Sequence, residues 1–262
     1  MNKKLLLALA GGCLLLCCCA LSIGASIYFF NKSQPLPKPD DILPTTKPSV
    51  MITQSKTPSP SPTVSQIIVP SLSGGFLETF DDNRNDWELG EYSEEYMYAY
   101  SSIENGKMIY ETEALQEDGG FIYDTYYNHP MTNFEASIDA KLIAGHEDTS
   151  YGIIFNRIDN QNFYFFIINA EYQQFKLKKF IGDEGEDVLT WTDSSAIRTT
   201  GINNVRVKKV GSLITLYVND QQIATATDSS FTEPGDIGFL VVHYNEGDTA
   251  TVEFDNLKII PR

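Results

Sequence analysis

Apolar and polar residues alternate with a period of two through most of the chain beyond residue 74. The pattern is clearest between Phe134 and Leu142, where every second residue is apolar and the residues between them are charged or carry a hydroxyl group. Successive side chains of a strand point to opposite faces of a sheet. The alternation therefore predicts a strand with one buried face and one solvated face.

Three further strands are predicted at 151–157, 162–169 and 172–180, so that residues 133–180 form a run of four antiparallel strands. Asp159 and Asn160 separate two of them, because these residues tolerate turn conformations and bond their own backbone. The strand at 162–169, NFYFFIIN, is apolar on both faces. A strand of this kind is covered on both sides or carries a binding surface on one of them.

Shorter alternating stretches lie on either side of this run. They predict strands at 76–80, 94–101, 107–112, 121–127, around Trp191, and at 204–210, 213–218, 221–227, 236–243 and 249–260. Roughly a dozen short strands with turn residues between them and no helical period are typical of a two-sheet antiparallel sandwich. We therefore expect one all-β domain over residues 75–262, a length that can bury a full core.

The N-terminal segment predicts a membrane anchor. Residues 5–30 form a stretch of 26 residues without a charge, and about 20 apolar residues span a bilayer as a helix. Lys3 and Lys4 precede it, so the positive-inside bias puts the N terminus in the cytoplasm and the rest of the chain outside. We expect residues 1–30 to be an N-terminal transmembrane helix of a single-pass cell-membrane protein with an extracytoplasmic C-terminal domain. A signal peptide cleaved near Gly24 and a lipidated cysteine are the alternatives.

Residues 31–74 have the composition of a disordered linker. This Pro/Ser/Thr-rich stretch holds nine prolines and few large apolar residues. It cannot bury enough surface to offset the entropy of ordering, and proline stiffens it towards an extended form. The sequence therefore predicts a stalk between the anchor and the β domain.

Charge narrows the range of partners. The first 74 residues hold six Lys and two Asp, which leaves 13 basic and 33 acidic residues and a net charge of −20 for residues 75–262. Phosphates would be repelled by such a domain, so nucleic acid and anionic lipid are excluded as expected partners. Divalent cations and neutral ligands such as sugars remain. All four cysteines lie in the first nineteen residues, which rules out a disulfide or a thiolate zinc site in the domain.

Several fragments together resemble a known superfamily. The most specific are NNVRVKKVGSLITLYVNDQQI at 203–223 and FDNLKI at 254–259, and the resemblance covers about residues 76–260. They are similar to the concanavalin A-like lectin/glucanase superfamily, in the bacterial branch labelled 3-keto-disaccharide hydrolase or laminin-G-like. The resemblance implies a jelly-roll sandwich with a concave sheet that often binds carbohydrate. It implies no particular activity, because one fold hosts many functions.

The sequence does not supply the carboxylate motif of the superfamily's glucanases. Those enzymes carry E-x-D-x-x-E on one strand, which places two carboxylates about 5–5.5 Å apart. Glu253 and Asp255 start such a motif, but Lys258 stands where the second glutamate is needed. We therefore predict a domain that is not an enzyme. A glycoside hydrolase of the 3-keto-disaccharide type, with carboxylates brought together by the fold, is the alternative.

Aromatic residues are the candidates for sugar binding, because a pyranose has an apolar face and a polar rim. Alternation places three tyrosines of the strand at 94–101 on one face. The candidate carbohydrate-binding residues are Tyr96, Tyr98, Tyr100, Tyr126, Tyr164 and Trp191. Tyrosine also fills half-buried sheet faces, and Trp191 is compatible with a core or a ligand position. We interpret Trp87, the other tryptophan, as a core residue.

A structural calcium ion is the candidate cofactor. Jelly-roll modules of this superfamily often hold calcium between their first and last strands, and the resemblance implies that Glu78 or Asp81 would bind it here with Asp255. The alternative is that these carboxylates are solvated. The sequence thus predicts a membrane-anchored, lectin-like domain that binds a glycan or cell-surface polysaccharide. A structural or sensory ectodomain that binds a protein is a further alternative.

Overall fold

The computed structural model describes residues 74–182 and 184–262. The predicted anchor and nearly all of the predicted linker lie outside the described residues, so both stay predictions. Within the described part of the chain no helix is long and apolar enough to span a membrane.

The described residues form two antiparallel sheets. The nine-stranded sheet has the order β13-β12-β11-β6-β15-β4-β3-β2, and β1 pairs with β15 beside this path. Its strands are β1 (Phe76–Glu78), β2 (Gly90–Ser93), β3 (Met97–Ile103), β4 (Met108–Ala114), β6 (Phe134–Gly145), β11 (Asn203–Val210), β12 (Leu213–Val218), β13 (Gln221–Thr227) and β15 (Thr249–Pro261).

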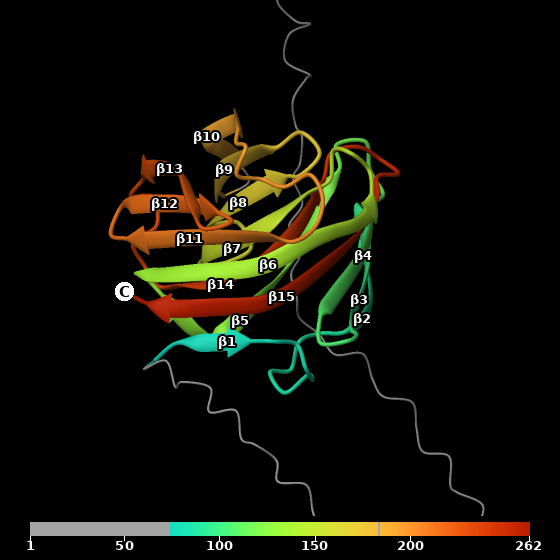
Figure 1. Cartoon of the computed structure of the whole chain (residues 1–262), viewed down its shortest axis with the longest axis horizontal. Coiled ribbons are helices and arrows are strands. Elements are labelled where there is room, and N and C mark those ends of the chain that lie inside the picture. Colours follow the sequence, from blue (N-terminus) through green and yellow to red (C-terminus); the bar gives the residue numbers. More distant parts are fainter. Residues whose placement is uncertain (1–73, 183) are drawn as a thin grey trace, which may run out of the picture.

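The six-stranded sheet has the order β10-β9-β8-β7-β14-β5. Its strands are β5 (Gly120–Met131), β7 (Ser150–Arg157), β8 (Phe163–Asn169), β9 (Gln174–Ile181), β10 (Glu184–Asp193) and β14 (Gly235–His243). The two sheets lie as layers of a sandwich, with β11, β6 and β15 in front of the six-stranded sheet in Figure 1. The predicted all-β, two-sheet jelly-roll architecture is confirmed.

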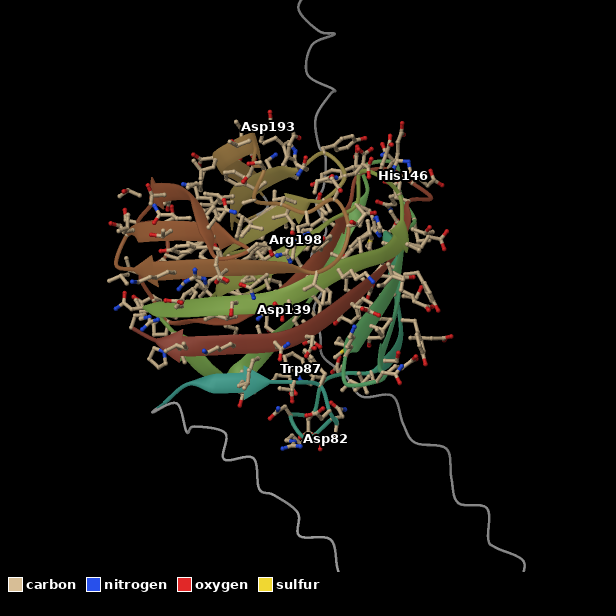
Figure 2. All side chains as sticks on the ribbon, viewed as in Figure 1. Asp82, Trp87, Asp139, His146, Asp193 and Arg198 are labelled. Carbon is tan, nitrogen blue, oxygen red and sulfur yellow. The ribbon has the colours of Figure 1, made fainter. Side chains whose placement is uncertain are left out.

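The main core fills the space between the sheets. The apolar residues that alternate along β6 point into it, and Phe134, Ala136 and Ile138 are fully buried. Trp87 is 5% exposed and belongs to this core, as predicted. Figure 2 shows Trp87 close to the loop that carries Asp82.

A second apolar cluster lies on the opposite face of the six-stranded sheet. Along β8, Tyr164, Phe166 and Ile168 belong to the main core, whereas the alternate residues belong to this outer cluster. Its buried members are Phe121, Ile154, Phe163, Phe165, Ile167, Phe180, Leu240 and Val242. The apolar character of both faces of NFYFFIIN is thus explained, because each face of β8 belongs to a different cluster.

The predicted strand at 94–101 differs from the structure at its start. The strand β3 begins at Met97, and Tyr96 lies in a bend before it. The alternation that places Tyr98 and Tyr100 on one face of β3 therefore does not determine the direction of the Tyr96 side chain. This difference decides where the three tyrosines lie.

Candidate functional site

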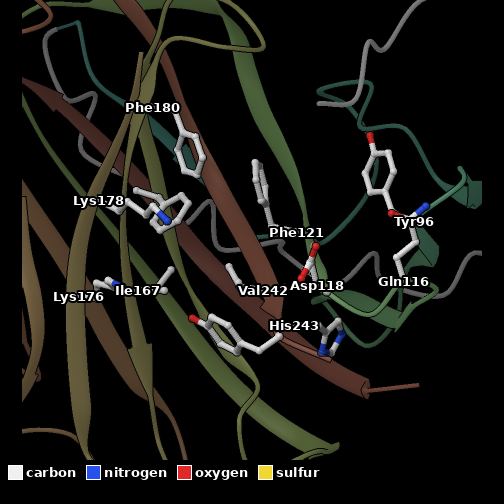
Figure 3. A pocket seen from close by; sticks show the side chains of 14 residues that line it. Tyr96, Gln116, Asp118, Phe121, Ile167, Lys176, Lys178, Phe180, Val242 and His243 are labelled. Carbon is white, nitrogen blue, oxygen red and sulfur yellow. The ribbon is translucent and has the colours of Figure 1, made fainter. Parts of the chain in front are cut away.

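A cavity of about 180 Å³ lies over the outer cluster of the six-stranded sheet. Its floor is apolar and comes from four strands of this sheet, as Figure 3 shows for several of these side chains. The floor residues are Phe121 of β5, Phe165 and Ile167 of β8, Phe180 of β9 and Val242 of β14. Phenylalanine rings pack closely here, with ring centroids 5.9 Å apart for Phe121 and Phe165 and 5.4 Å apart for Phe165 and Phe180.

Polar side chains surround this apolar floor. Lys176 and Lys178 extend from β9 on one side, and Tyr96, Gln116 and Asp118 lie on the other. Figure 3 shows the two groups at opposite ends of the cavity, with Val242 between them. The arrangement combines an apolar platform with hydrogen-bonding groups at its edge.

The turn between β4 and β5 holds the second group in place. The Leu115 amide donates to the Tyr96 carbonyl at 2.9 Å, and the Gly119 amide donates to the Gln116 carbonyl at 2.9 Å. Gly119 has φ +66°, and a Cβ there would lie 2.3 Å from the carbonyl oxygen of His243. Only glycine allows this close approach, which brings the turn against the end of β14.

The lysines on β9 are placed by strand alternation. Phe175 and Leu177 point into the main core, so Lys176 and Lys178 point to the outer face. Lys176 pairs in register with Ile167, and Lys178 pairs with Phe165. Both ammonium groups therefore lie at the edge of the apolar floor.

The two lysines differ in their partners. The Lys176 ammonium lies 3.0 Å from a carboxylate oxygen of Asp187 on β10 and 5.6 Å from the centre of the Trp191 ring. The Lys178 ammonium lies 5.1 Å from the centre of the Phe180 ring. Burial, and secondly the charge of Lys176, lower the pKa of Lys178, while Asp187 opposes the shift.

His243 and Tyr244 complete the lining near the end of β14. His243 is 1% exposed, and burial lowers its pKa to about 4, so its imidazole is neutral at pH 7. Its Nε2 lies 2.8 Å from the Thr112 hydroxyl, and its Nδ1 has no hydrogen-bond partner among the described residues. Burial raises the pKa of Tyr244 to about 12, which keeps its hydroxyl protonated.

The structure places one of the six predicted sugar-binding residues in the lining of this cavity. Tyr96 lines it. Trp191 packs against the outer cluster, with its ring 6.4 Å from that of Tyr244 and inclined at 65°. Trp191 is not among the described residues that line the cavity, but its ring lies beside two that do, Lys176 and Tyr244.

The other four predicted residues lie elsewhere. Tyr98 and Tyr100 are on the outward face of the nine-stranded sheet, opposite the buried Met97 and Ala99 of β3. Tyr126 stacks on Phe76, with ring centroids 3.7 Å apart.

Tyr164 points into the main core, and its hydroxyl donates to a carboxylate oxygen of Asp228 at 2.5 Å. None of these four tyrosines is among the described residues that line the cavity.

Sequence reasoning missed the lysines, the turn residues Gln116 and Asp118, and Tyr244. Lysines that alternate with apolar residues along a strand are typical of a solvent-exposed face, so the sequence does not mark them as part of a site. One signal was compatible with the site, because the doubly apolar strand at 162–169 was predicted either to be covered on both sides or to carry a binding surface on one face. That strand supplies Phe165 and Ile167 to the floor.

The carboxylates of the candidate calcium ligands accept hydrogen bonds from residues close to them in the sequence. Glu78 is 4% exposed, and its carboxylate accepts hydrogen bonds from the Phe80 amide at 2.7 Å, the Trp87 indole nitrogen at 2.9 Å and the Asn85 amide group at 2.5 Å. These donors engage both oxygens of Glu78, and its role as a calcium ligand stays a prediction.

Asp81 accepts a bond from the Thr79 hydroxyl at 2.8 Å, and Asp255 accepts one from the Asn256 amide at 2.7 Å. The described residues contain no group of three or more His, Cys, Asp or Glu side chains that could hold a metal ion. A calcium ion at Asp81 and Asp255 stays a prediction.

A family model described as a 3-keto-alpha-glucoside-1,2-lyase-like domain matches residues 75–260. This match confirms the predicted resemblance and its extent. No curated protein matches the chain.

Several solved structures are similar to it. The carbohydrate-binding module CBM66 from Bacillus subtilis is 19% identical, with 56% of this chain and 85% of that chain covered and a TM-score of 0.45. A beta-glucanase from Bacillus licheniformis is 12% identical, with 72% and 99% covered and a TM-score of 0.46. The catalytic domain of an endo-1,3-beta-glucanase from Thermotoga petrophila is 12% identical, with 70% and 95% covered and a TM-score of 0.44.

Proposed function

This chain belongs to the 3-keto-alpha-glucoside-1,2-lyase-like domain family, and we propose that the cavity on its six-stranded sheet binds carbohydrate without transforming it. The observation that carries the proposal is the apolar floor of Phe121, Phe165 and Phe180 with polar side chains at its edge. A sugar ring has an apolar face that packs on such a floor and hydroxyl groups that bond to the rim.

The size of the cavity suits a small part of a glycan. Sites for drug-sized ligands usually measure about 300–1,000 Å³, and this one measures about 180 Å³. We infer that it holds one sugar unit, while neighbouring units of a glycan or cell-surface polysaccharide extend into solvent. On the predicted anchor and linker, the domain would present this site outside the membrane.

Hydrolysis is less well supported by the geometry. A glycosidase needs two carboxylates about 5–5.5 Å apart for retention or about 6.5–9.5 Å apart for inversion. Among the described residues that line the cavity, one carboxylate is present, that of Asp118.

A lyase reaction on a 3-keto sugar is the second candidate function, and His243 is the observation that favours it. Removal of a proton beside a carbonyl group requires a base. The neutral imidazole of His243 lines the cavity, and its Nδ1 has no hydrogen-bond partner among the described residues.

A glycan array with the purified chain, run with calcium and again with a chelator, tests the binding proposal. Saturable binding of one glycan class is expected, and the bound glycan should be recovered intact. Cleavage of a 3-keto-alpha-glucoside by the chain, lost in His243→Gln, would instead establish the lyase. No binding to any glycan in either condition would contradict the proposal.

A further inference from the structure

Strand β9 carries three lysines, and two of them have anionic partners. Lys176 pairs with Asp187 at 3.0 Å. Lys179 points to the other face, where its ammonium lies 2.9 Å from Asp228 and 3.2 Å from Glu186. Both positive charges are therefore neutralised within the protein.

Lys178 is the exception. Its ammonium lines the cavity beside the Phe180 ring, and it makes no hydrogen bond or ion pair with any part of the chain that the structure describes. Asp187, which pairs in register with Lys178 on β10, acts on its ammonium without forming an ion pair with it and is already paired with Lys176. An ammonium group at an apolar surface without a direct anionic partner is costly, because its hydration is reduced. The nearby ring offsets only part of this cost.

We propose that the cavity is specific for an acidic sugar, a uronic acid unit whose carboxylate pairs with the ammonium of Lys178. The inference rests on the proposed carbohydrate-binding function and names the class of sugar. A carboxylate supplies the one negative charge that Lys178 lacks, and its pyranose ring packs on Phe165 and Phe180. Charge-assisted hydrogen bonds of this kind are stronger than those between neutral groups.

Gly185 of β10 leaves the space that the Lys178 ammonium occupies. Gly185 pairs in register with Phe180. A Cβ at position 185 would lie 2.5 Å from Cε of Lys178 and 3.0 Å from its Nζ. Any side chain there would displace the ammonium, so the glycine keeps Lys178 at the edge of the floor.

The acidic surface of the domain restricts the ligand further. A net charge of −20 over residues 75–262 opposes the approach of a long polyanion. A short saccharide with one carboxylate experiences much less of this repulsion, which is screened beyond about 8 Å at physiological ionic strength. The site is therefore expected to select a single uronic acid unit over a sulfated polysaccharide.

Calorimetric titration of the full-length chain in detergent with methyl glucuronide and methyl glucoside tests the inference. The two probes differ only in the carboxylate that replaces a hydroxymethyl group. We expect the glucuronide to bind about tenfold more tightly, since hydrogen bonds to charged groups have about this effect. Lys178→Met should abolish the preference for the glucuronide, whereas Lys178→Arg should retain it.

Two further variants separate the role of Lys178 from a general loss of structure or charge. Lys176→Met removes a positive charge from the same strand, but this charge is already paired with Asp187. It should therefore reduce the preference by less than threefold. Gly185→Ala displaces the Lys178 ammonium without removing it, and its Cβ would also lie 2.9 Å from Cε1 of Phe180. It should therefore weaken binding of the glucuronide more than binding of the glucoside.

The outcomes distinguish this inference from the proposed function. Equal affinity for the two probes, or an unchanged preference in Lys178→Met, would overturn the acidic-sugar inference and leave carbohydrate binding in place. A stronger response to a sulfated glucoside would overturn the choice of a carboxylate. Absence of binding to both probes, together with an empty glycan array, would overturn the proposed function as well.

Discussion

The carboxylate of Glu78 accepts a hydrogen bond of 2.9 Å from the indole nitrogen of Trp87, nine positions along the chain. The same carboxylate accepts the Phe80 amide, so one buried side chain closes the loop that follows β1. This loop anchors Trp87 and Phe80 in the main core.

Replacement of Glu78 should therefore destabilise the domain. In Glu78→Ala the Phe80 amide and the Trp87 indole lose their acceptor while they remain buried, which costs about 2–4 kcal/mol in the free energy of unfolding. Urea unfolding followed by tryptophan fluorescence measures this. Glu91→Ala, at an exposed glutamate of β2, is the matched control and should change the free energy by less than about 0.5 kcal/mol. Similar stability of both variants would contradict the role of Glu78.

The acid stability of the domain should depend on His243. Burial lowers its pKa to about 4 in the folded state, against about 6.5 when unfolded. Asp248 opposes this shift and His146 adds to it. Between pH 6.5 and pH 4 the unfolded chain binds a proton that the folded chain does not bind at His243. The free energy of unfolding therefore decreases as the pH falls from 6.5 to 4. Below pH 4, His243 lowers it no further. The contribution amounts to about 3 kcal/mol.

Denaturant unfolding at pH 7.5 and pH 5 checks this expectation. His243→Gln removes the titrating group and should flatten the pH dependence in this window. An equally steep dependence in His243→Gln would show that other groups cause it. An NMR titration of the His243 ring should give a midpoint near pH 4 in the folded chain.

Asp228 should affect the free energy of unfolding over a lower pH range than His243. Burial alone would raise the pKa of its carboxyl group, but hydrogen bonds from Tyr164, Ser230 and Lys179 outweigh it and hold the pKa well below the ordinary value. The folded state thus gains stability above about pH 4, the unfolded pKa, and loses it as the pH falls towards the folded pKa. Tyr164→Phe should cost about 1–2 kcal/mol at pH 7 and less at pH 2.5. Urea unfolding at both pH values measures this loss of free energy of unfolding. An equal loss at pH 7 and pH 2.5 would contradict the link between the Tyr164 hydrogen bond and the ionisation of Asp228.

Glycan binding should change the fluorescence of Trp191 rather than that of Trp87. The chain has two tryptophans, and Trp87 is buried in the main core while Trp191 packs against the outer cluster beside Lys176 and Tyr244, which line the cavity. Trp191→Phe should abolish the ligand-induced change. Trp191→Ala should weaken binding about tenfold, since an aromatic contact contributes roughly 0.5–1.5 kcal/mol beyond its buried area.

Tyr100→Ala is the control for this series, because Tyr100 is 38% exposed on the nine-stranded sheet. Its affinity for the glycan should equal that of the unmodified chain. Loss of binding in Tyr100→Ala with full binding in Trp191→Ala would move the site to the other sheet.

The predicted calcium ion gives a separate expectation. If Asp81 and Asp255 hold it, calcium should raise the melting temperature of the chain and a chelator should lower it, since a ligand that binds only the folded state stabilises that state. Asp255→Asn should remove the difference. Equal melting temperatures with calcium and with chelator would exclude a calcium ion that stabilises the fold.

Much of the fold could be predicted because its signals are local. The alternation along 134–142 and 204–210 reports which residues face the core, and this depends only on the period of a strand. The doubly apolar strand at 162–169 correctly indicated a second apolar surface for the same reason. The burial of Trp87 followed from its place after the first strand and turn.

The site could be predicted only in part. Tyr96, Tyr98 and Tyr100 have equivalent positions in the alternating pattern, but a bend before β3 turns Tyr96 towards the cavity. Lys176, Lys178 and Lys179 look alike in the sequence. Their different environments come from Asp187, Gly185 and Asp228, which are supplied by β10 and by the segment after β13.

The sequence by itself thus determined most of the strands, the all-β class and the family, because side-chain alternation and turn chemistry act over a few residues. Only the tertiary structure decided which face of which sheet carries the cavity. Antiparallel pairing in the order β10-β9-β8-β7-β14-β5 brings Lys178, Phe165 and Val242 together from distant parts of the chain. Alternation assigns a residue to a face of its own strand, but the other strands that form the cavity on that face are joined by long-range pairing.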